Sequence, residues 1–362
     1  MKRIHVLIVF NEPTIQSGDG RKYISESGKI QELATRQQVM AAVQQELVDL
    51  SEVGVLEERE DVQRALESIG YRASLFNMNA DVKRLIRVVE EKQPDIIFNL
   101  CESVGNEAIH EMHVAGIYEL LGVPYTGANA FALGTCLNKV RTKEILFYHK
   151  ILTPKFALLR NITELNADAF DLSYPLIVKP SREDASVGIE NDSVVENIMA
   201  LKKRVRHVIQ TYDQPALVEE YIEGRELNVA IMGNKKPIVL PISEIDFSGL
   251  PEDYPKIVTY NGKWMQGTAE FVGTVGKCPA TLTADLERKI KDIALKAYRV
   301  MGCRDYARVD VRLKNGTPYV LEVNPNPDMT DDAGFARSTR AYGLSFEDAI
   351  GNIIEYALER TP

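Results

Sequence analysis

Residues 306–324 read YARVDVRLKNGTPYVLEVN, in which polar and apolar side chains alternate on both sides of a Lys-Asn-Gly step. Alternation is typical of β-strands, because successive side chains point to opposite faces of a sheet. Arg308, Asp310 and Arg312 therefore share one face of the first strand. A three-residue loop over residues 314–316, with its glycine in the left-handed conformation, predicts a hairpin in which residue 308 pairs with residue 322.

This register would place the polar residues of both strands on one side of the sheet. We expect Asp310, Glu322 and Asn324 to converge there. Carboxylate and amide oxygens suit Mg²⁺, which binds a few carboxylates together with phosphate oxygens. For the hairpin by itself, however, the solvated face of an antiparallel sheet is the favoured interpretation.

The overall composition indicates a globular protein with more than one domain. The chain has 362 residues, of which 45% are hydrophobic and 26% charged, and this length suits about two or three domains. Its net charge of -9 argues against nucleic acid as a partner, because binding to a phosphate backbone usually needs a basic surface.

The cysteines and the N-terminus indicate the compartment. The 4 cysteines lie far apart and form no CxxC pair, which is typical of thiols in a reducing environment. The apolar run from His5 to Phe10 is too short for a signal peptide, and no stretch approaches the roughly 18 apolar residues of a membrane span. We therefore predict a cytoplasmic protein without a membrane segment.

Apolar runs at residues 5–10, 71–78 and 95–100 alternate with segments of helical periodicity. This order is typical of a parallel sheet with crossover helices, and it predicts an α/β fold. A long polar segment over residues 14–50 follows the first run. Its apolar residues recur at helical spacing and predict an inserted helix: Leu33, Val39, Met40, Val43 and Leu47.

Two further segments have features of a nucleotide site. Lys179 ends an apolar run, and the loop after it, SREDASVG, could surround phosphates with backbone N–H groups while the lysine neutralises their charge. Glu219 and Glu220 lie in a predicted strand whose Tyr221 and Ile222 could offer backbone groups to a purine edge. Each segment alone is also typical of an ordinary strand end or a solvated edge.

Five collinear motifs together resemble the ATP-grasp domain of D-alanine–D-alanine ligases, from about Asp95 to Leu358. They are LGVPYTG at 121–127, NKVRTKEIL at 138–146, YPLIVKPSRE with ASVG at 174–188, VEEYIEGREL at 218–227, and GCRDYARVDVRL, LEVNPNP and MT within 302–330.

The resemblance implies an ATP-grasp fold that follows an N-terminal Rossmann-like domain built on a parallel sheet. The implied limits are 1–130 for the N-terminal domain with an insertion at 14–50, 131–225 for the central ATP-grasp subdomain, and 226–362 for the C-terminal subdomain with a lid at 246–270.

The resemblance also implies a reaction. ATP phosphorylates a carboxylate, and an amine then displaces phosphate from the acyl-phosphate. The enzyme would be an ADP-forming carbon–nitrogen ligase that acts on amino acids or peptides, and the family is commonly dimeric, which suggests a homodimer. Metal ions, lysines and an arginine suit both steps, because each step develops negative charge on oxygen atoms.

Residue roles follow from the same resemblance. The implied ATP contacts are Lys139, Lys179, Ser186, Glu219, Glu220, Tyr221, Ile222 and Glu226. Asp310, Glu322 and Asn324 would bind two Mg²⁺ ions, for which Mn²⁺ could substitute. Arg308 would stabilise the transition state, and Lys263 takes the lysine position of the family's lid motif.

The amino-acid half of the site departs from the family. The N-terminal Glu-x-x-Val-Ser motif, whose glutamate receives the first substrate's ammonium, has no clear match. The family's Ser-Ser pair is Ala185-Ser186, the lid tyrosine is Trp264, the serine that binds the acceptor's carboxylate aligns with Ala333, and Asp328 replaces a glycine. These changes indicate that the hydrogen-bonded Ser-Tyr set is missing and predict altered amino-acid specificity. Two alternatives stay open, an authentic D-alanine–D-alanine ligase and a non-catalytic, ATP-binding regulatory protein.

Overall fold

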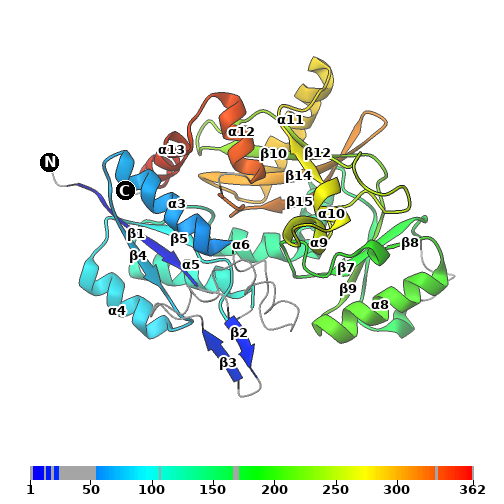
Figure 1. Cartoon of the computed structure of the whole chain (residues 1–362), viewed down its shortest axis with the longest axis horizontal. Coiled ribbons are helices and arrows are strands. Elements are labelled where there is room, and N and C mark those ends of the chain that lie inside the picture. The colour runs from blue at the N-terminus through cyan, green and yellow to red at the C-terminus, as the bar shows by residue number, and fades with distance from the viewer. Residues whose placement is uncertain are drawn as a thin grey trace.

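The computed structural model describes residues 3–11, 14–17, 20–23, 54–105, 107–165, 171–330 and 333–360. Its strands form a parallel sheet near the N-terminus and two antiparallel sheets in the rest of the chain (Figure 1). The α/β class predicted from the sequence is confirmed.

The N-terminal sheet has the order β4-β1-β5, and its strands are parallel, as predicted. β1 is buried along its whole length because both of its faces are covered. Val6, Ile8 and Phe10 pack in a core with helices α3 and α13, whereas Leu7 and Val9 pack in a second core on the opposite face. The elements of this part are β1 (His5–Phe10), α3 (Val55–Ser68), β4 (Arg72–Asn77), α4 (Val82–Lys92), β5 (Ile96–Leu100), α5 (His110–Leu121) and α6 (Ala130–Leu137).

The predicted insertion begins differently from the expectation. Strands β2 (Thr14–Ser17) and β3 (Gly20–Tyr23) form an antiparallel hairpin, although only helical periodicity had been recognised in this segment. The hairpin was missed because each strand has only 4 residues, too few for a period-2 pattern to be distinctive. The predicted helix itself, with Leu33 to Leu47, lies outside the described residues.

The central sheet has the order β6-β9-β7-β8 and packs one face on helix α8 (Figure 1). Leu176 and Val178 of β7 and Val218 of β9 meet Leu201 and Val205 of the helix in that core. The elements are α7 (Lys139–Tyr148), β6 (Phe156–Leu159), the 3₁₀ helix η2 (Ile162–Glu164), β7 (Leu176–Pro180), the 3₁₀ helix η3 (Asn191–Ser193), β8 (Val194–Val195), α8 (Ile198–Tyr212) and β9 (Ala216–Glu220).

The C-terminal sheet has the order β13-β12-β10-β14-β15, and β11 also pairs with β10. Its apolar face packs against α11 through Val229, Val309 and Val311, which lie with Ile290 and Ala294 in one core. The elements are β10 (Arg225–Met232), β11 (Ile238–Val239), β12 (Ser243–Asp246), α9 (Tyr260–Trp264), α10 (Ala269–Gly273), β13 (Val275–Lys277), α11 (Ala284–Val300), β14 (Tyr306–Lys314), β15 (Thr317–Asn324), α12 (Gly334–Tyr342) and α13 (Phe346–Leu358).

The β14–β15 hairpin forms as predicted, but its register differs. Lys314 pairs with Thr317, so the loop consists of Asn315 and Gly316 alone. Both have positive φ, 49° and 73°, which is the conformation of a tight two-residue hairpin turn. The prediction of a three-residue loop was wrong because it placed only Gly316 in the left-handed conformation, whereas Asn315 adopts it as well.

A β-bulge then restores the predicted convergence. Beyond the turn the register shifts between Asp310 and Val311, so that Asp310 pairs with Glu322 and Arg308 pairs with Asn324. Leu321 is the extra residue of the bulge. Without it, Glu322 would face the opposite side of the sheet from Asp310, because neighbouring residues in a strand alternate between faces. The bulge therefore decides which side chains of β15 join the polar face of β14.

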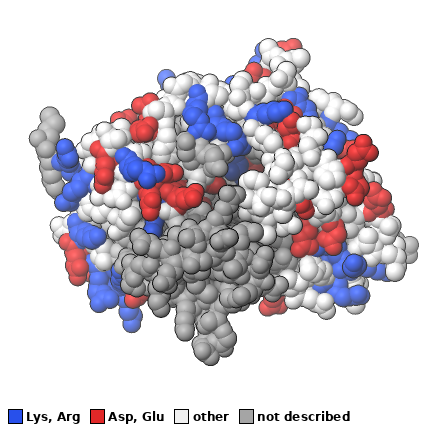
Figure 2. Space-filling view, in the orientation of Figure 1, with Lys and Arg blue, Asp and Glu red and all other residues white. Residues whose placement is uncertain are grey.

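The remaining sequence predictions concern the surface and membranes. Within the described ranges, no helix is long and apolar enough to cross a membrane. Figure 2 shows basic and acidic side chains interspersed over the visible face, without one large basic field.

Candidate functional site

A cavity of about 990 Å³ is lined by the polar face of the C-terminal sheet, the central sheet and helices α9 and α10. Asp310 and Arg312 on this polar face are only 6% and 3% exposed, so the face is not the solvated surface that the hairpin alone had suggested. The cavity lining includes every residue selected from the sequence: Lys139, Lys179, Ala185, Ser186, Glu219, Glu220, Tyr221, Ile222, Glu226, Lys263, Trp264, Arg308, Asp310, Glu322, Asn324, Asp328 and Ala333.

Asp310 is the centre of the polar face. Arg308 donates to both of its carboxylate oxygens, from Nε at 2.8 Å and from Nη2 at 2.9 Å. Asn324 Nδ2 donates to Oδ2 at 2.9 Å, and Asn228 Nδ2 donates to Oδ1 at 2.7 Å. Burial opposes the charge of Arg308, but the adjacent Asp310 carboxylate outweighs it and raises the pKa of the guanidinium. Asn228, on the neighbouring strand β10, was not recognised because asparagine in a strand has no distinctive pattern.

Glu322 lies across from Asp310 and pairs with Lys139, whose Nζ is 2.9 Å from Oε2. Burial alone would raise the pKa of Glu322, but the charges of Lys139 and Lys179 lower it well below its usual range. The carboxylate is therefore ionised at neutral pH. Lys139 reaches it from the first residue of α7, whose N-terminus is capped by the side chain of Asn138.

The oxygen donors of Asp310, Glu322 and Asn324 fit a divalent cation. Across the described segments, no group of three or more His, Cys, Asp or Glu side chains is arranged to hold a metal ion. A cation at this position would therefore complete its coordination with oxygens that the protein does not supply, as Mg²⁺ commonly does with phosphate oxygens.

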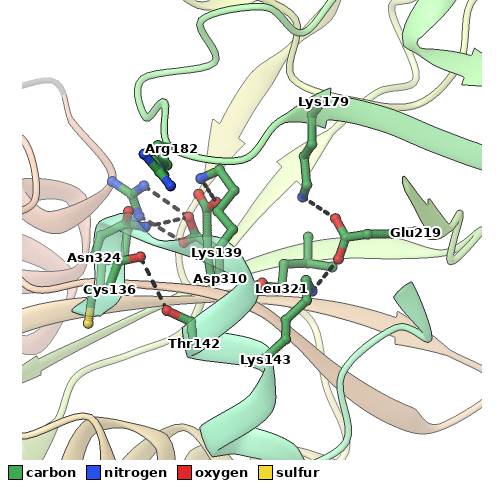
Figure 3. A network of polar contacts seen from close by, with 12 residues as sticks. Cys136, Lys139, Thr142, Lys143, Lys179, Arg182, Glu219, Asp310, Leu321 and Asn324 are labelled. Atoms are coloured by element: carbon green, nitrogen blue, oxygen red, sulfur yellow. Dashed lines mark hydrogen bonds and ion pairs between the residues drawn. The ribbon is translucent and has the colours of Figure 1, made fainter. Parts of the chain in front are cut away.

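A buried ion triad joins helix α7 to the central sheet (Figure 3) and consists of Lys143, Lys179 and Glu219. The carboxylate of Glu219 contacts the ammonium groups of Lys143 and Lys179, which approach it from opposite sides. Lys143 is fully buried and also donates to Thr153 Oγ1 at 2.9 Å. Burial lowers the pKa of Lys143 to about 8, although Glu219 partly opposes this effect. The triad holds Lys179 at the cavity wall, and Lys143 was not selected from the sequence although it lies within the motif NKVRTKEIL.

One end of the cavity has an apolar wall with a partly buried acid, Glu226. Ile222 and Ile257 are buried there, beside Tyr221. Glu226 pairs with Arg312 at 2.7 Å between Oε2 and Nη2. This end can accept a flat apolar group, with a carboxylate at its edge to accept hydrogen bonds.

The loop after β7 has an unusual backbone and is held by the segment at 246–270. Ala185 and Ser186 have positive φ, 48° and 64°. Trp264 Nε1 donates to the backbone oxygen of Ala185 at 2.9 Å. The sequence had indicated that the hydrogen-bonded set between this loop and the lid was absent. The hydroxyl groups are indeed missing, but the indole N–H of Trp264 restores a bond to the loop by using a backbone acceptor.

Two buried acids near Asp328 were not selected from the sequence. Glu58 of α3 accepts a hydrogen bond from the backbone N–H of Met329 at 2.8 Å, and Glu111 of α5 accepts one from Asn326 Nδ2 at 3.0 Å. Burial raises the pKa of both carboxyl groups well above its usual value. Neither could be found from the sequence, because both acids lie on helices far from the segment 326–329 along the chain.

Comparisons with known proteins agree with this geometry. A family model described as the D-ala D-ala ligase C-terminus matches residues 149–355. The chain is 31% identical to a D-alanine–D-alanine ligase of Desulforudis audaxviator, over 82% of this chain and 91% of that protein. It is 33% identical to y4sG, an uncharacterized protein of Sinorhizobium fredii, over 83% of this chain and 87% of that protein. The crystal structure of the D-alanine–D-alanine ligase of Bacillus anthracis complexed with ATP has the same fold, with a TM-score of 0.71, 24% identity and 98% of each chain covered.

Proposed function

Because this chain belongs to the D-alanine–D-alanine ligase family, we propose that it is an ATP-dependent, ADP-forming ligase that joins a carboxylate to an amine. One observation carries the proposal. The cavity brings the cations of Lys139, Lys179 and Arg308 to the same place as the oxygen donors of Asp310 and Glu322. Such a set suits phosphoryl transfer, which depends on positioning and on stabilising negative charge.

ATP would lie with its adenine against Tyr221 and Ile222 and its ribose at Glu226. Lys139 and Lys179 would neutralise its phosphates, and the backbone around Ser186 would cover them. Asp310, Glu322 and Asn324 would hold Mg²⁺ ions, which when bound neutralise the phosphate charge. The fit of their oxygen donors supports this assignment.

The reaction would proceed in two steps. A carboxylate oxygen of the donor substrate attacks the γ-phosphorus of ATP, ADP leaves, and an acyl-phosphate forms. The amine nitrogen of the acceptor then attacks the acyl carbon, phosphate leaves, and the nitrogen loses a proton. In the second step Arg308 would stabilise the negative oxygen that forms when the amine adds to the acyl carbon. Asp310 orients the Arg308 guanidinium through two hydrogen bonds.

The segment 246–270 would act as a lid, with Lys263 facing the phosphates, and it would protect the acyl-phosphate from water. We further propose the division expected from the sequence, with limits at 1–130, 131–225 and 226–362. The central part has its own core, whereas the N-terminal sheet shares a core with residues after 230. The cytoplasmic location and the homodimer stay predictions.

The favoured substrates are not two molecules of D-alanine. Ala185, Ala333 and Trp264 lack the hydroxyl groups that the resemblance leads one to expect, and each lost charge-assisted bond costs about 1.5 to 3 kcal/mol. Synthesis of D-alanyl-D-alanine is the second candidate, because the ligases at about 31% identity carry that name. Comparing kcat/KM for D-alanine with values for larger amino acids and dipeptides decides between the two.

The ligase proposal is tested by changing Glu322 to Gln. We expect ADP release in the presence of Mg²⁺ and pooled amino acids to fall at least about 100-fold, because a ligand charge is lost where the phosphoryl group moves. The circular dichroism spectrum should be unchanged. Glu287→Gln, at an acid on α11 that pairs with Lys291, is the control and should retain full activity. Full activity in Glu322→Gln would refute the metal assignment.

A further inference from the structure

One cation in the cavity wall has no place in the reaction described above. Arg337 lies in the first turns of α12, one helical turn after Ala333, and both residues line the cavity. Residues four apart lie on the same face of a helix, so the two side chains border the same space. Arg337 therefore adds a positive charge where Ala333 presents only a methyl group.

Two glycines lie beside the guanidinium of Arg337. A Cβ atom added at Gly276 of β13 would lie 2.2 Å from Cζ and Nη2 of Arg337, so no other residue fits there while the guanidinium lies against this strand. A Cβ atom added at Gly334 would lie 3.5 Å from Arg337 Nη2 and 4.0 Å from Arg308 Cδ. Arg337 and Arg308 thus border one small space beside Gly334.

Arg308 and Arg337 differ in their polar contacts within the protein. Arg308 donates to both oxygens of Asp310, so the Asp310 carboxylate fixes the position of its guanidinium. Arg337 comes from another element and has a polar contact of its own within the protein, which a ligand would share. A guanidinium offers parallel N–H groups that match a carboxylate.

The geometry points to Arg337 as the residue that binds the carboxylate of the acceptor substrate. This assignment rests on the proposed ligase function. The donor's reacting carboxylate must lie at the γ-phosphate and is converted into the acyl-phosphate, so it cannot remain as a charged partner of Arg337. The acceptor's carboxylate keeps its charge throughout the reaction. The acceptor is therefore an amino acid or a peptide with a free carboxylate, and not a simple amine or a polyamine.

The test compares each acceptor with its carboxamide. Wild type, Arg337→Gln and Arg337→Lys receive ATP, Mg²⁺ and one fixed pool of free amino acids as carboxylate donors, and the acceptors added are free amino acids or the matching amino-acid amides. The amide product formed from each added acceptor is measured. We expect wild type to prefer the free acids by about tenfold to a hundredfold in kcat/KM, the energy of one charge-assisted contact. Arg337→Gln should lose this preference through a higher KM for the acid, and Arg337→Lys should keep part of it. Arg340→Gln, on the exposed side of the same helix, should behave as wild type.

A second measurement separates this inference from the ligase proposal. The thermal midpoint of the protein with ADP and Mg²⁺ is measured with pooled free amino acids and with pooled amino-acid amides. The acids should raise the midpoint more than the amides in wild type, and this difference should shrink in Arg337→Gln, where binding of the donor at the γ-phosphate position remains. This assay needs no turnover, so it decides the role of Arg337 even if no ADP release is found. An equal response to acids and amides in wild type, or an unchanged preference in Arg337→Gln, would overturn the assignment.

Discussion

At the scale of single residues, Glu58 is a buried acid whose surroundings disfavour its charge. It is only 4% exposed, and it keeps one hydrogen bond, from the backbone N–H of Met329. Burial raises the pKa of its carboxyl group well above the usual value, and the nearby charges of Glu102 and Asp328 raise it further. The folded protein therefore binds a proton at Glu58 under conditions where the unfolded chain has lost it.

The raised pKa of Glu58 makes the stability of the fold depend on pH. A carboxyl group with a raised pKa stabilises the fold fully below the unfolded value of about 4.5, and this contribution is lost as the pH rises through the folded pKa. Glu58→Gln keeps the acceptor for Met329 and removes the titration. We expect the variant to be more stable than wild type by roughly 1 to 3 kcal/mol at pH 8 and similar to it at pH 4.5, as measured by urea unfolding. A constant difference at both pH values would contradict this.

At the scale of elements, the segment 246–270 is attached to the loop after β7 by a few bonds. Besides the bond from Trp264, the backbone N–H of Tyr260 donates to Ile189 at 2.9 Å, and Asn191 Nδ2 donates to Glu270 at 3.1 Å. Figure 1 shows α9 and α10 between the C-terminal sheet and the central sheet. Breaking these bonds to the loop after β7 would release this side of the segment and open the cavity.

We expect ATP and Mg²⁺ to slow cleavage of this segment by trypsin after Lys256 and Lys263, because a bound nucleotide adds contacts to the closed lid. Trp264→Phe should raise the cleavage rate of the nucleotide-loaded protein about twofold to tenfold, the effect of one lost hydrogen bond. Val272→Ala, at a residue of α10 that follows this segment and is 67% exposed, is the matched control. Equal cleavage rates with and without ATP would argue against a lid.

At the scale of the whole molecule, Asp305 joins segments that are far apart in the sequence. It is fully buried and accepts hydrogen bonds from the backbone N–H of Gly127 at 2.9 Å and from Asn234 Nδ2 at 3.1 Å. Arg360, close to the end of the chain, donates to both of its oxygens and also to the backbone oxygen of Tyr125. The carboxylate therefore links the N-terminal part, the C-terminal sheet and the last helix.

Arg360→Ala should lower the free energy of unfolding by about 3 kcal/mol, because it leaves the buried Asp305 without its cation. The Arg360 side chain is 22% exposed, so water can reach the site and the loss should not exceed this amount. Urea unfolding at neutral pH measures the change. Arg288→Ala breaks only an exposed pair with Asp285 on α11 and should change stability by less than about 1 kcal/mol. Losses of equal size in the two variants would refute the assigned role of Asp305.

Much of the fold was predictable because its patterns are local. The run from His5 to Phe10 is apolar throughout, as expected of a strand covered on both faces, and the alternation after Tyr306 reports one packed and one polar face. The candidate site residues could be selected because they lie on these strands or in the motifs beside them. Glu58 and Arg337 could not be selected in this way, since neither lies on one of these strands or in one of the motifs.

The sequence by itself determined the parallel N-terminal sheet, the β14–β15 hairpin and the family, and it selected the candidate residues that line the cavity. Periodicity and motifs of this kind are written in neighbouring positions. Only the tertiary structure decided that the polar face of β14 lines a cavity, that the bulge at Leu321 turns Glu322 toward Asp310, and that Gly276 leaves room for Arg337. These features depend on the approach of segments distant in the chain, and the free energy of such contacts is not expressed in any local pattern.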